Sequence, residues 1–310
     1  MSYTYLDLAK EVLIDSQTPL RLGEIWKRAK EKGLQDKLEN SFSPLKQTLS
    51  RALHDDIRRN RAGIFAISKN PTLFGLEGKH DKEYQPSEET PKKQVSFKER
   101  DLHPLFVRFA RDKLGIACKT IRHERSAKDK KGKSEWLHPD IVGVKFACEK
   151  KETLGLLKTL AYPKVELYAF ELKIFVGFHN FKKSYFQAVS NASWADYGYL
   201  AVFGIDDDEE LLDELKKLNA RFGIGILYFG RDDNQFEKFF IPAKPKEKID
   251  ISMIDELIAK GNEDFKNFIK QVKNDAEKEK IESSQEGYDE ILGDERLESY
   301  IKTHNITYEE

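Results

Sequence analysis

Cysteine, long apolar runs and leader-like segments are scarce in this chain of 310 residues. Its two cysteines, Cys118 and Cys148, lie in strand-like segments, and we expect ordinary buried thiols rather than a disulfide framework. No apolar run approaches the roughly 20 residues that a membrane-spanning helix needs. The first residues lack the basic and apolar regions of a signal peptide. We therefore expect a cytoplasmic protein that does not contact a membrane.

Two common kinds of functional site are also missing from the sequence. No spacing of cysteine and histidine is typical of a zinc site, and no glycine-rich phosphate loop is present. The lack of a Walker motif argues against ATP-driven chemistry within this chain. The formal net charge is −1, but the charge is unevenly distributed: residues 1–80 hold 14 Lys and Arg against 10 Asp and Glu, and residues 281–310 hold 2 against 9. A basic front can bind nucleic acid despite the balanced total, because the local field decides.

The length and the composition predict two folded regions. Residues 1–78 carry three helical patterns and then two strand patterns, which is the order of a winged helix-turn-helix domain. Residues 79–96 are rich in Glu, Lys, Pro and Ser and predict a linker. Residues 97–243 predict an α/β domain with a central mixed sheet flanked by helices, in the order α-β-β-β-α-β with a further αβ pair. Residues 244–310 predict a charged helical extension, with disorder from residue 281 onward.

Apolar periodicity gives the expected elements. Helices are predicted over residues 3–14, 22–33, from Pro44 onward, 102–114, 152–160, 182–197 and 208–218. Strands are predicted over residues 64–67, 72–76, 116–121, 136–146, 165–175, 199–204 and 223–229.

A pair of short acidic motifs marks two of these strands. Pro139-Asp140 opens one apolar run, and Glu171-Leu172-Lys173 closes another, Leu167-Tyr168-Ala169-Phe170. Residues two apart in a strand share a face, so Glu171 and Lys173 lie together. A neighbouring strand that carries Asp140 would complete a site of two carboxylates and one ammonium. Two carboxylates suit Mg²⁺, and a water activated by Mg²⁺ beside a lysine can hydrolyse a phosphodiester.

These motifs on successive strands, followed by a helix with Gln187, resemble the PD-(D/E)XK nuclease superfamily. The resemblance implies a restriction-endonuclease-like fold and a DNA endonuclease that uses Mg²⁺, for which Mn²⁺ would substitute. The implied metal ligands are Asp140, Glu171, the carbonyl of Leu172 and an extra acid, Glu99. The implied catalytic residues are Asp140, Glu171, Lys173, which would orient or deprotonate the attacking water, and Gln187. The alternative is a pair of strands joined by a salt bridge, without a catalytic role. The two acids lie 31 positions apart in the numbering, so the helix at 152–160 must be an insertion.

Two histidines lie near these motifs, and each allows two interpretations. His138 could donate to a phosphate or support Asp140 directly, or it could only orient its neighbour. We favour the orienting role. His123 fits a DNA-backbone or structural role better than that of a general base.

A basic segment precedes the first acidic motif. Residues 119–133 hold seven Lys and Arg against two acids, and predict a loop that contacts phosphates. The candidate DNA contacts there are Arg122, Arg125, Lys128, Lys130, Lys131 and Lys133. The alternative is a charged loop that is merely solvated.

The first region carries apolar motifs in a recognisable order. They are Thr4-Tyr5-Leu6-Asp7-Leu8-Ala9, Pro19-Leu20, Ile25-Trp26, Thr48-Leu49-Ser50-Arg51-Ala52-Leu53 and Phe74-Gly75-Leu76. They resemble the HARE-HTH domain, a winged helix found fused to restriction nucleases and to chromatin or polymerase subunits. We expect Trp26 in the core. If the third helix enters the major groove, the candidate DNA contacts are Lys46, Gln47, Ser50, Arg51, His54 and Arg58. The alternative is a solvated helix face in a protein-binding module.

A chain that combines these two domains resembles the HrgA-like, restriction-associated bacterial proteins. They imply a metal-dependent endonuclease in restriction or genome defence, whose winged helix selects the site and whose second domain cuts double-stranded DNA. A homodimer and a restriction-modification partner would fit this function. The alternatives are a DNA-binding regulator on an inactive nuclease fold, or a repair nuclease that acts on structured DNA.

Overall fold

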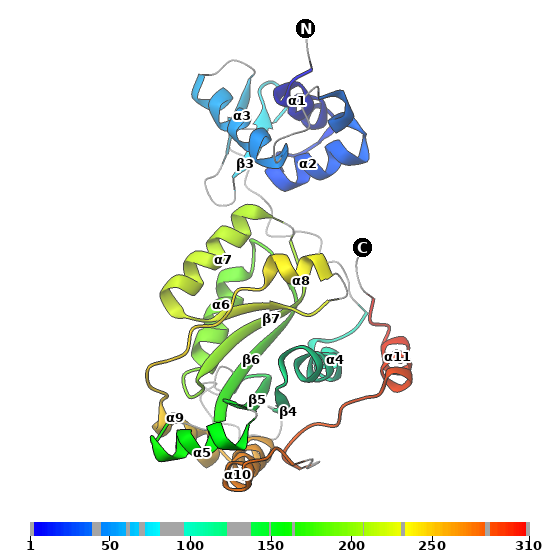
Figure 1. Cartoon of the computed structure of the whole chain (residues 1–310). Coiled ribbons are helices and arrows are strands. Elements are labelled where there is room, and N and C mark those ends of the chain that lie inside the picture. The colour runs from blue at the N-terminus through cyan, green and yellow to red at the C-terminus, as the bar shows by residue number, and fades with distance from the viewer. Residues whose placement is uncertain are drawn as a thin grey trace. The chain divides into compact units, whose positions relative to one another are not determined.

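The computed structural model of the chain divides into two compact units (Figure 1). One is built mainly from Met1–Lys92 and the other mainly from the residues after it. The structure describes residues 3–38, 45–59, 63–67, 72–80, 96–122, 138–148, 150–162, 165–206, 208–230, 233–282 and 286–307. The division falls in the segment predicted as a linker, of which residues 81–95 lie outside the described part. Within the described ranges, no helix has the length and apolar character needed to cross a membrane.

The N-terminal unit has the winged helix-turn-helix order predicted from the sequence. Its elements are α1 (Tyr5–Asp15), β1 (Leu20–Arg21), α2 (Leu22–Glu31), a 3₁₀ helix (Leu34–Lys37), α3 (Leu45–Arg59), β2 (Ile64–Ala66) and β3 (Leu73–Leu76). The strands form an antiparallel sheet in the order β1-β3-β2. Strand β1 was not predicted, because two residues are too few to show an alternating pattern.

Local signals explain where α1 begins and which face it buries. Asp7 N donates to Thr4 Oγ1 at 3.2 Å, and Thr4 N donates to Asp7 Oδ2 at 2.9 Å, which is a capping box. The apolar stripe of α1 then packs into the core of the unit, together with Leu49 and Leu53 of α3. Trp26 is buried in this core, as expected, and burial of such a side chain contributes about 2–3 kcal/mol.

The second unit is a mixed α/β domain. Its first elements are a 3₁₀ helix (Glu99–Leu102), α4 (His103–Phe109) with a π-helical end (Ala110–Leu114), β4 (Ala117–Thr120), β5 (Ile141–Phe146), α5 (Lys151–Thr159) and β6 (Val165–Val176). The rest are α6 (Phe181–Asn191), β7 (Tyr197–Ile205), α7 (Glu209–Phe222), β8 (Gly225–Tyr228), α8 (Asp233–Phe239), α9 (Ile251–Ala259), α10 (Glu263–Lys278) and α11 (Asp294–Thr303). The run α4-β4-β5-β6-α6-β7 reproduces the predicted order.

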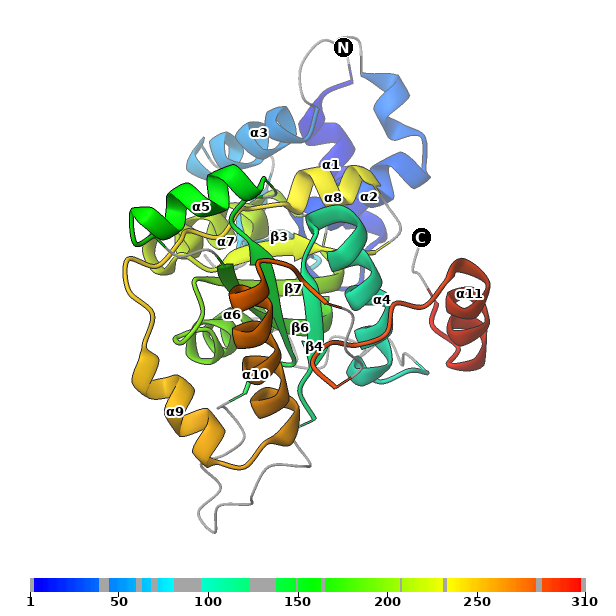
Figure 2. The ribbon, with the colours of Figure 1, turned by 60° about the horizontal axis from the view of Figure 1, so that its bottom comes forward.

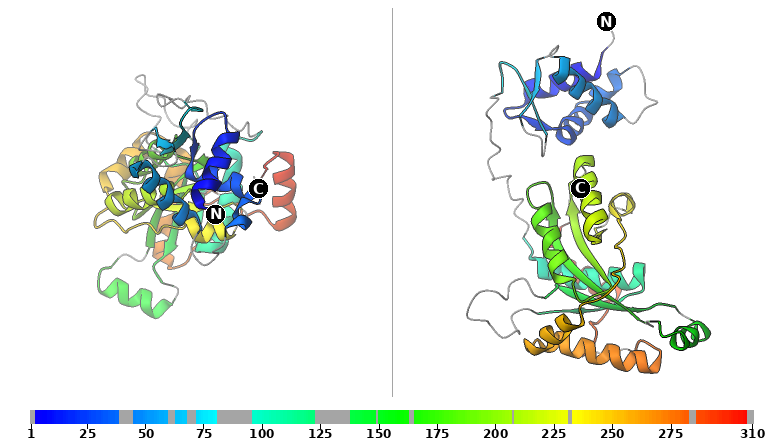
Figure 3. Two further views of the ribbon diagram at one scale, coloured as in Figure 1. Left: turned by 90° about the horizontal axis from the view of Figure 1, so that it is seen from above. Right: turned by 90° about the vertical axis from the view of Figure 1, so that its left-hand side faces the viewer.

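Five strands form one mixed sheet in the order β4-β5-β6-β7-β8. The pairs β4–β5 and β5–β6 are antiparallel, whereas β6–β7 and β7–β8 are parallel, with α6 and α7 as the crossover helices. Helix α5 is the insertion in the β5–β6 connection, and it stands away from the sheet in both views of Figure 3. The long separation of the two acidic motifs in the sequence is therefore compatible with direct pairing of their strands.

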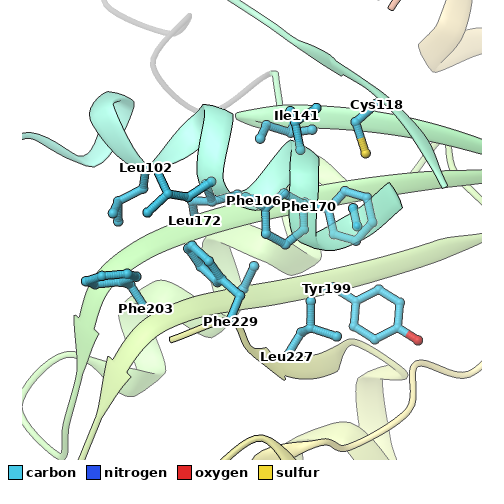
Figure 4. Packing of buried hydrophobic residues seen from close by; sticks show 14 of the residues in the cluster. Leu102, Phe106, Cys118, Ile141, Phe170, Leu172, Tyr199, Phe203, Leu227 and Phe229 are labelled. Carbon is cyan, nitrogen blue, oxygen red and sulfur yellow. The ribbon is translucent and has the colours of Figure 1, made fainter. Parts of the chain in front are cut away.

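One face of the sheet carries an aromatic core beneath α4 (Figure 4). The Phe106 ring lies 4.8 Å from the Phe170 ring and 5.2 Å from the Phe229 ring, centroid to centroid. Gly143 of β5 belongs to this packing because a Cβ there would lie 2.6 Å from Ile116 Cγ2. Cys118 is buried in the same cluster, as expected. Cys148 follows β5 and is only half-buried, so its predicted burial in a strand is not observed.

The C-terminal segment is part of this unit rather than a separate extension. Phe265 and Phe268 of α10 are fully buried, and Figure 2 shows α10 alongside β4. Asp289 N donates to Cys118 O at 2.8 Å, and Thr120 N donates to Asp289 Oδ2 at 2.7 Å, so this segment covers the edge of β4. The predicted disorder from residue 281 onward is therefore wrong for residues 286–307, which include α11.

Candidate functional site

The pairing of β5 with β6 brings the two acidic motifs together. Ile141 lies opposite Phe170 in the antiparallel register, so Asp140 and Glu171 follow at the same level of the ladder. Leu172 N donates to Asp140 Oδ2 at 2.8 Å, which ties the first motif directly to the second. The side chain of Leu172 points into the core, so Glu171 and Lys173 share the other face of β6, as predicted.

Lys173 is the centre of the resulting cluster. Its Nζ donates to Glu171 Oε1 at 2.8 Å, to Glu99 Oε1 at 3.2 Å and to Leu172 O at 2.7 Å. Glu99 comes from the 3₁₀ helix before α4, far away in the sequence. The extra acid proposed from the resemblance therefore lies beside the lysine.

Burial and like charge control the electrostatics of this cluster. Glu171 is only 2% exposed, and burial, followed by the charge of Asp140, raises its pKa to about 7, although Lys173 and Asn191 oppose the rise. Burial also raises the pKa of Glu99. Burial disfavours the charge of Lys173, but Glu171, Glu99 and Asp140 outweigh that effect and raise its pKa. In this state Lys173 is an ammonium, which can orient a water or neutralise charge but has no lone pair with which to accept a proton.

Helix α6 contributes a residue that the sequence analysis missed. Asn191, not Gln187, contacts the cluster, and Asn191 Nδ2 donates to Glu171 Oε2 at 2.8 Å. Gln187 lies one turn earlier on the same helix face, is half-buried, and makes no hydrogen bond within the described ranges. The helix was predicted to run to residue 197, but it ends at Asn191. Asn191 follows Gln187 by four residues, which places both on one face of the helix. This spacing could have identified Asn191 from the sequence.

His138 directly precedes the motif Pro139-Asp140. It is buried, and its ring centroid lies 6.2 Å from that of Phe265 of α10. The orienting role of His138 stays a prediction. His123 lies outside the described residues.

The oxygen donors of the cluster can be compared with what a metal ion needs. Among the residues that the structure describes, no group of three or more His, Cys, Asp or Glu side chains is arranged to hold a metal. Mg²⁺ requires less, since one or two carboxylates and retained waters suffice. Asp140, Glu171 and the carbonyl of Leu172 provide hard oxygens of this kind, and they therefore fit Mg²⁺ better than a softer metal.

The predicted DNA contacts are only partly described. Arg122 N donates to Asp264 Oδ2 at 3.1 Å and its guanidinium lies 3.5 Å from Asp264 Oδ1, so this arginine joins β4 to α10. The other candidates of the basic segment lie outside the described ranges: Arg125, Lys128, Lys130, Lys131 and Lys133.

On α3, Arg51, His54 and Arg58 are exposed, and Ser50 is half-buried. Arg58 lies 3.2 Å from Asp55, and the His54 ring packs edge-on against Phe74. The side chains of Lys46 and Gln47 lie outside the described part. Of the described candidates, Arg51 is therefore the most suitable for a test of DNA contact.

Comparison with known families identifies the first unit. Residues 3–78 match the HARE-HTH family model, whose description includes ASXL and a restriction endonuclease HTH domain. The match confirms the predicted HARE-HTH domain and supports DNA binding. No curated protein and no solved structure matches the chain.

Proposed function

We propose that this protein is a metal-dependent DNA endonuclease with a PD-(D/E)XK-like site at Asp140, Glu171 and Lys173. The observation that carries the proposal is the contact of Lys173 with the buried Glu171, beside Asp140 on the neighbouring strand. A buried carboxylate with a raised pKa opposes folding when it is ionised, and such groups gather at functional sites. A salt-bridged strand pair kept only for stability would not need several acids around one lysine.

The arrangement of the second unit supports the same proposal. The order α4-β4-β5-β6-α6-β7, with antiparallel pairing before β6 and parallel pairing after it, presents the two motifs on adjacent strands. This agrees with the restriction-endonuclease-like fold that the motifs led us to expect.

The side chains have distinct roles in the proposed reaction. Asp140, Glu171 and the carbonyl of Leu172 would hold Mg²⁺. When bound, this ion would polarise the scissile phosphate and lower the pKa of the attacking water. The Lys173 ammonium would orient that water and offset the negative charge that develops on the phosphate. Glu99 accepts a hydrogen bond from Lys173 and so keeps the ammonium near the carboxylates.

The HARE-HTH domain would supply DNA affinity. A DNA-binding domain joined to a nuclease domain suits restriction or genome defence, as in the HrgA-like proteins that the chain resembles. Cleavage of both strands of a duplex needs two cuts, which a homodimer would provide.

The decisive experiment is cleavage of modified and unmodified plasmid DNA with Mg²⁺ or Mn²⁺. Lys173→Ala should lower the cleavage rate by about 100-fold or more while the protein still binds DNA. Lys183→Ala, which removes an exposed lysine of α6, is the matched control and should cleave like the native protein. Full cleavage by Lys173→Ala would refute the site. DNA binding without cleavage by the native protein would instead favour a regulator on an inactive nuclease fold.

A further inference from the structure

The carboxyl end of α6 is held firmly beside the candidate site. Asn191 O accepts a hydrogen bond from Trp194 Nε1 at 3.0 Å, and the next carbonyl, of Ala192, accepts one from Lys246 Nζ. Trp194 is fully buried and packs edge-on against Phe265, with 5.1 Å between ring centroids. These contacts come from the α6–β7 turn, from the segment after β8 and from α10. The backbone of Asn191 therefore has little freedom to move relative to β6.

The side chain of Asn191 is buried and only half satisfied. It is 3% exposed, and its Nδ2 donates to Glu171 Oε2 at 2.8 Å. Its Oδ1 is buried and has no hydrogen-bond partner among the residues that the structure describes. A buried polar atom without a partner costs about 1–3 kcal/mol, so stability alone does not favour an asparagine here. An ionised carboxylate only accepts hydrogen bonds, which requires Nδ2 to face Glu171.

The two oxygens of Glu171 are held by different kinds of donor. Lys173 binds Oε1 with a positive charge, and Asn191 binds Oε2 without one. A cation that binds at Oε1 takes the place of the ammonium there and leaves the neutral amide on Oε2 in place. The amide contact can therefore persist when the cation binds.

We propose that Asn191 is a positioning residue that holds Glu171 by Oε2 and so presents Oε1 to the cation. This inference rests on the proposed function. Hydrogen bonds from outside the ligand set commonly orient metal-binding carboxylates in this way, and their loss weakens metal affinity by about 10–100-fold.

A structural role for Asn191, as a link between α6 and the sheet, is the competing explanation. Asn219 of α7 provides the matched control because it is also buried and its Nδ2 also donates, to Ile224 O at 2.9 Å and to Pro242 O at 3.0 Å. Asn219→Ala therefore removes buried amide hydrogen bonds from the same unit without touching a carboxylate of the site.

The test is Mn²⁺ binding by isothermal titration calorimetry on the full chain, with thermal unfolding measured in parallel. Asn191→Ala should bind Mn²⁺ about 10–100-fold more weakly than the native protein. Asn219→Ala should melt earlier yet bind Mn²⁺ as the native protein does. Native affinity in Asn191→Ala, or equal weakening in both variants, would overturn the proposal. If Asn191→Ala does not fold, Asn191→Ser replaces it, and failure of both to fold would establish the structural role instead.

A second readout separates this inference from the proposed function. If the native protein neither binds Mn²⁺ nor cleaves DNA, the proposed function fails, and crystal structures of the metal-free native and Asn191→Ala proteins decide the remaining question. A Glu171 carboxylate that turns away in the variant would support positioning by Asn191. An unmoved carboxylate would overturn it.

Discussion

Replacing Glu171 with glutamine should remove the loss of stability that this group causes in the metal-free protein as the pH rises, and it should also abolish cleavage. Glutamine keeps the shape of the side chain but cannot ionise. The Asn191 amide can reverse, so that its Oδ1 accepts a hydrogen bond from the new amide. The variant thus removes a titratable group without creating a cavity.

The pKa of Glu171 determines the sign and the size of the effect. Its ordinary value of 4.5 is raised to about 7 in the folded protein, mainly by burial and then by Asp140, with Lys173 opposing. Between these two values the folded state holds a proton that the unfolded state has released, so stability falls as the pH rises. At about 1.4 kcal/mol for each pH unit, the native protein loses about 3 kcal/mol from this group across the window. The glutamine variant cannot ionise at this position, so it loses no stability from this group.

Urea unfolding from about pH 4.5 to pH 8 in the presence of a chelator measures this difference. A Trp26→Phe background leaves Trp136 and Trp194 as fluorescent reporters, both of which follow Lys93. The stability of Glu171→Gln relative to its parent should rise by about 3 kcal/mol from the acid to the alkaline end. Glu256→Gln, a surface control on α9, should show no such rise. If the difference in stability between Glu171→Gln and its parent stays constant with pH, the argument that burial raises the pKa of Glu171 is refuted.

Two further predictions concern other parts of the chain. Asp289→Ala leaves Thr120 N and the buried ammonium of Lys119 without this acid, so the free energy of unfolding should fall by about 3 kcal/mol in urea titrations. A loss close to zero would show that the segment before α11 does not stabilise β4. Arg51→Ala on α3 should weaken DNA binding and reduce the slope of log affinity against log salt by about 0.9 if the arginine contacts one phosphate. An unchanged slope in fluorescence anisotropy titrations would exclude that contact.

Local sequence patterns were sufficient to predict much of the structure of this protein. Helical periodicity and a capping box at Thr4 define α1, and the apolar motifs of residues 3–78 identify the HARE-HTH domain. In β6, alternation alone places Glu171 and Lys173 on one face. These features depend on neighbours within a few residues, and such neighbours can be read directly from the sequence.

Other features depend on partners that lie far apart in the chain. Asn191 meets Glu171 over 20 residues, Glu99 meets Lys173 over 74, and Asp289 meets Thr120 over 169. The C-terminal segment looked disordered because composition records its charges but not the groups that pair with them. Gln187 and Asn191 share a helix face, and only the end of α6 and its packing against β6 decided which one contacts the acid. The sequence by itself determined most elements of the two domains and the charged motif on β6. Tertiary packing decided which distant side chains surround that motif, because no local rule specifies those contacts.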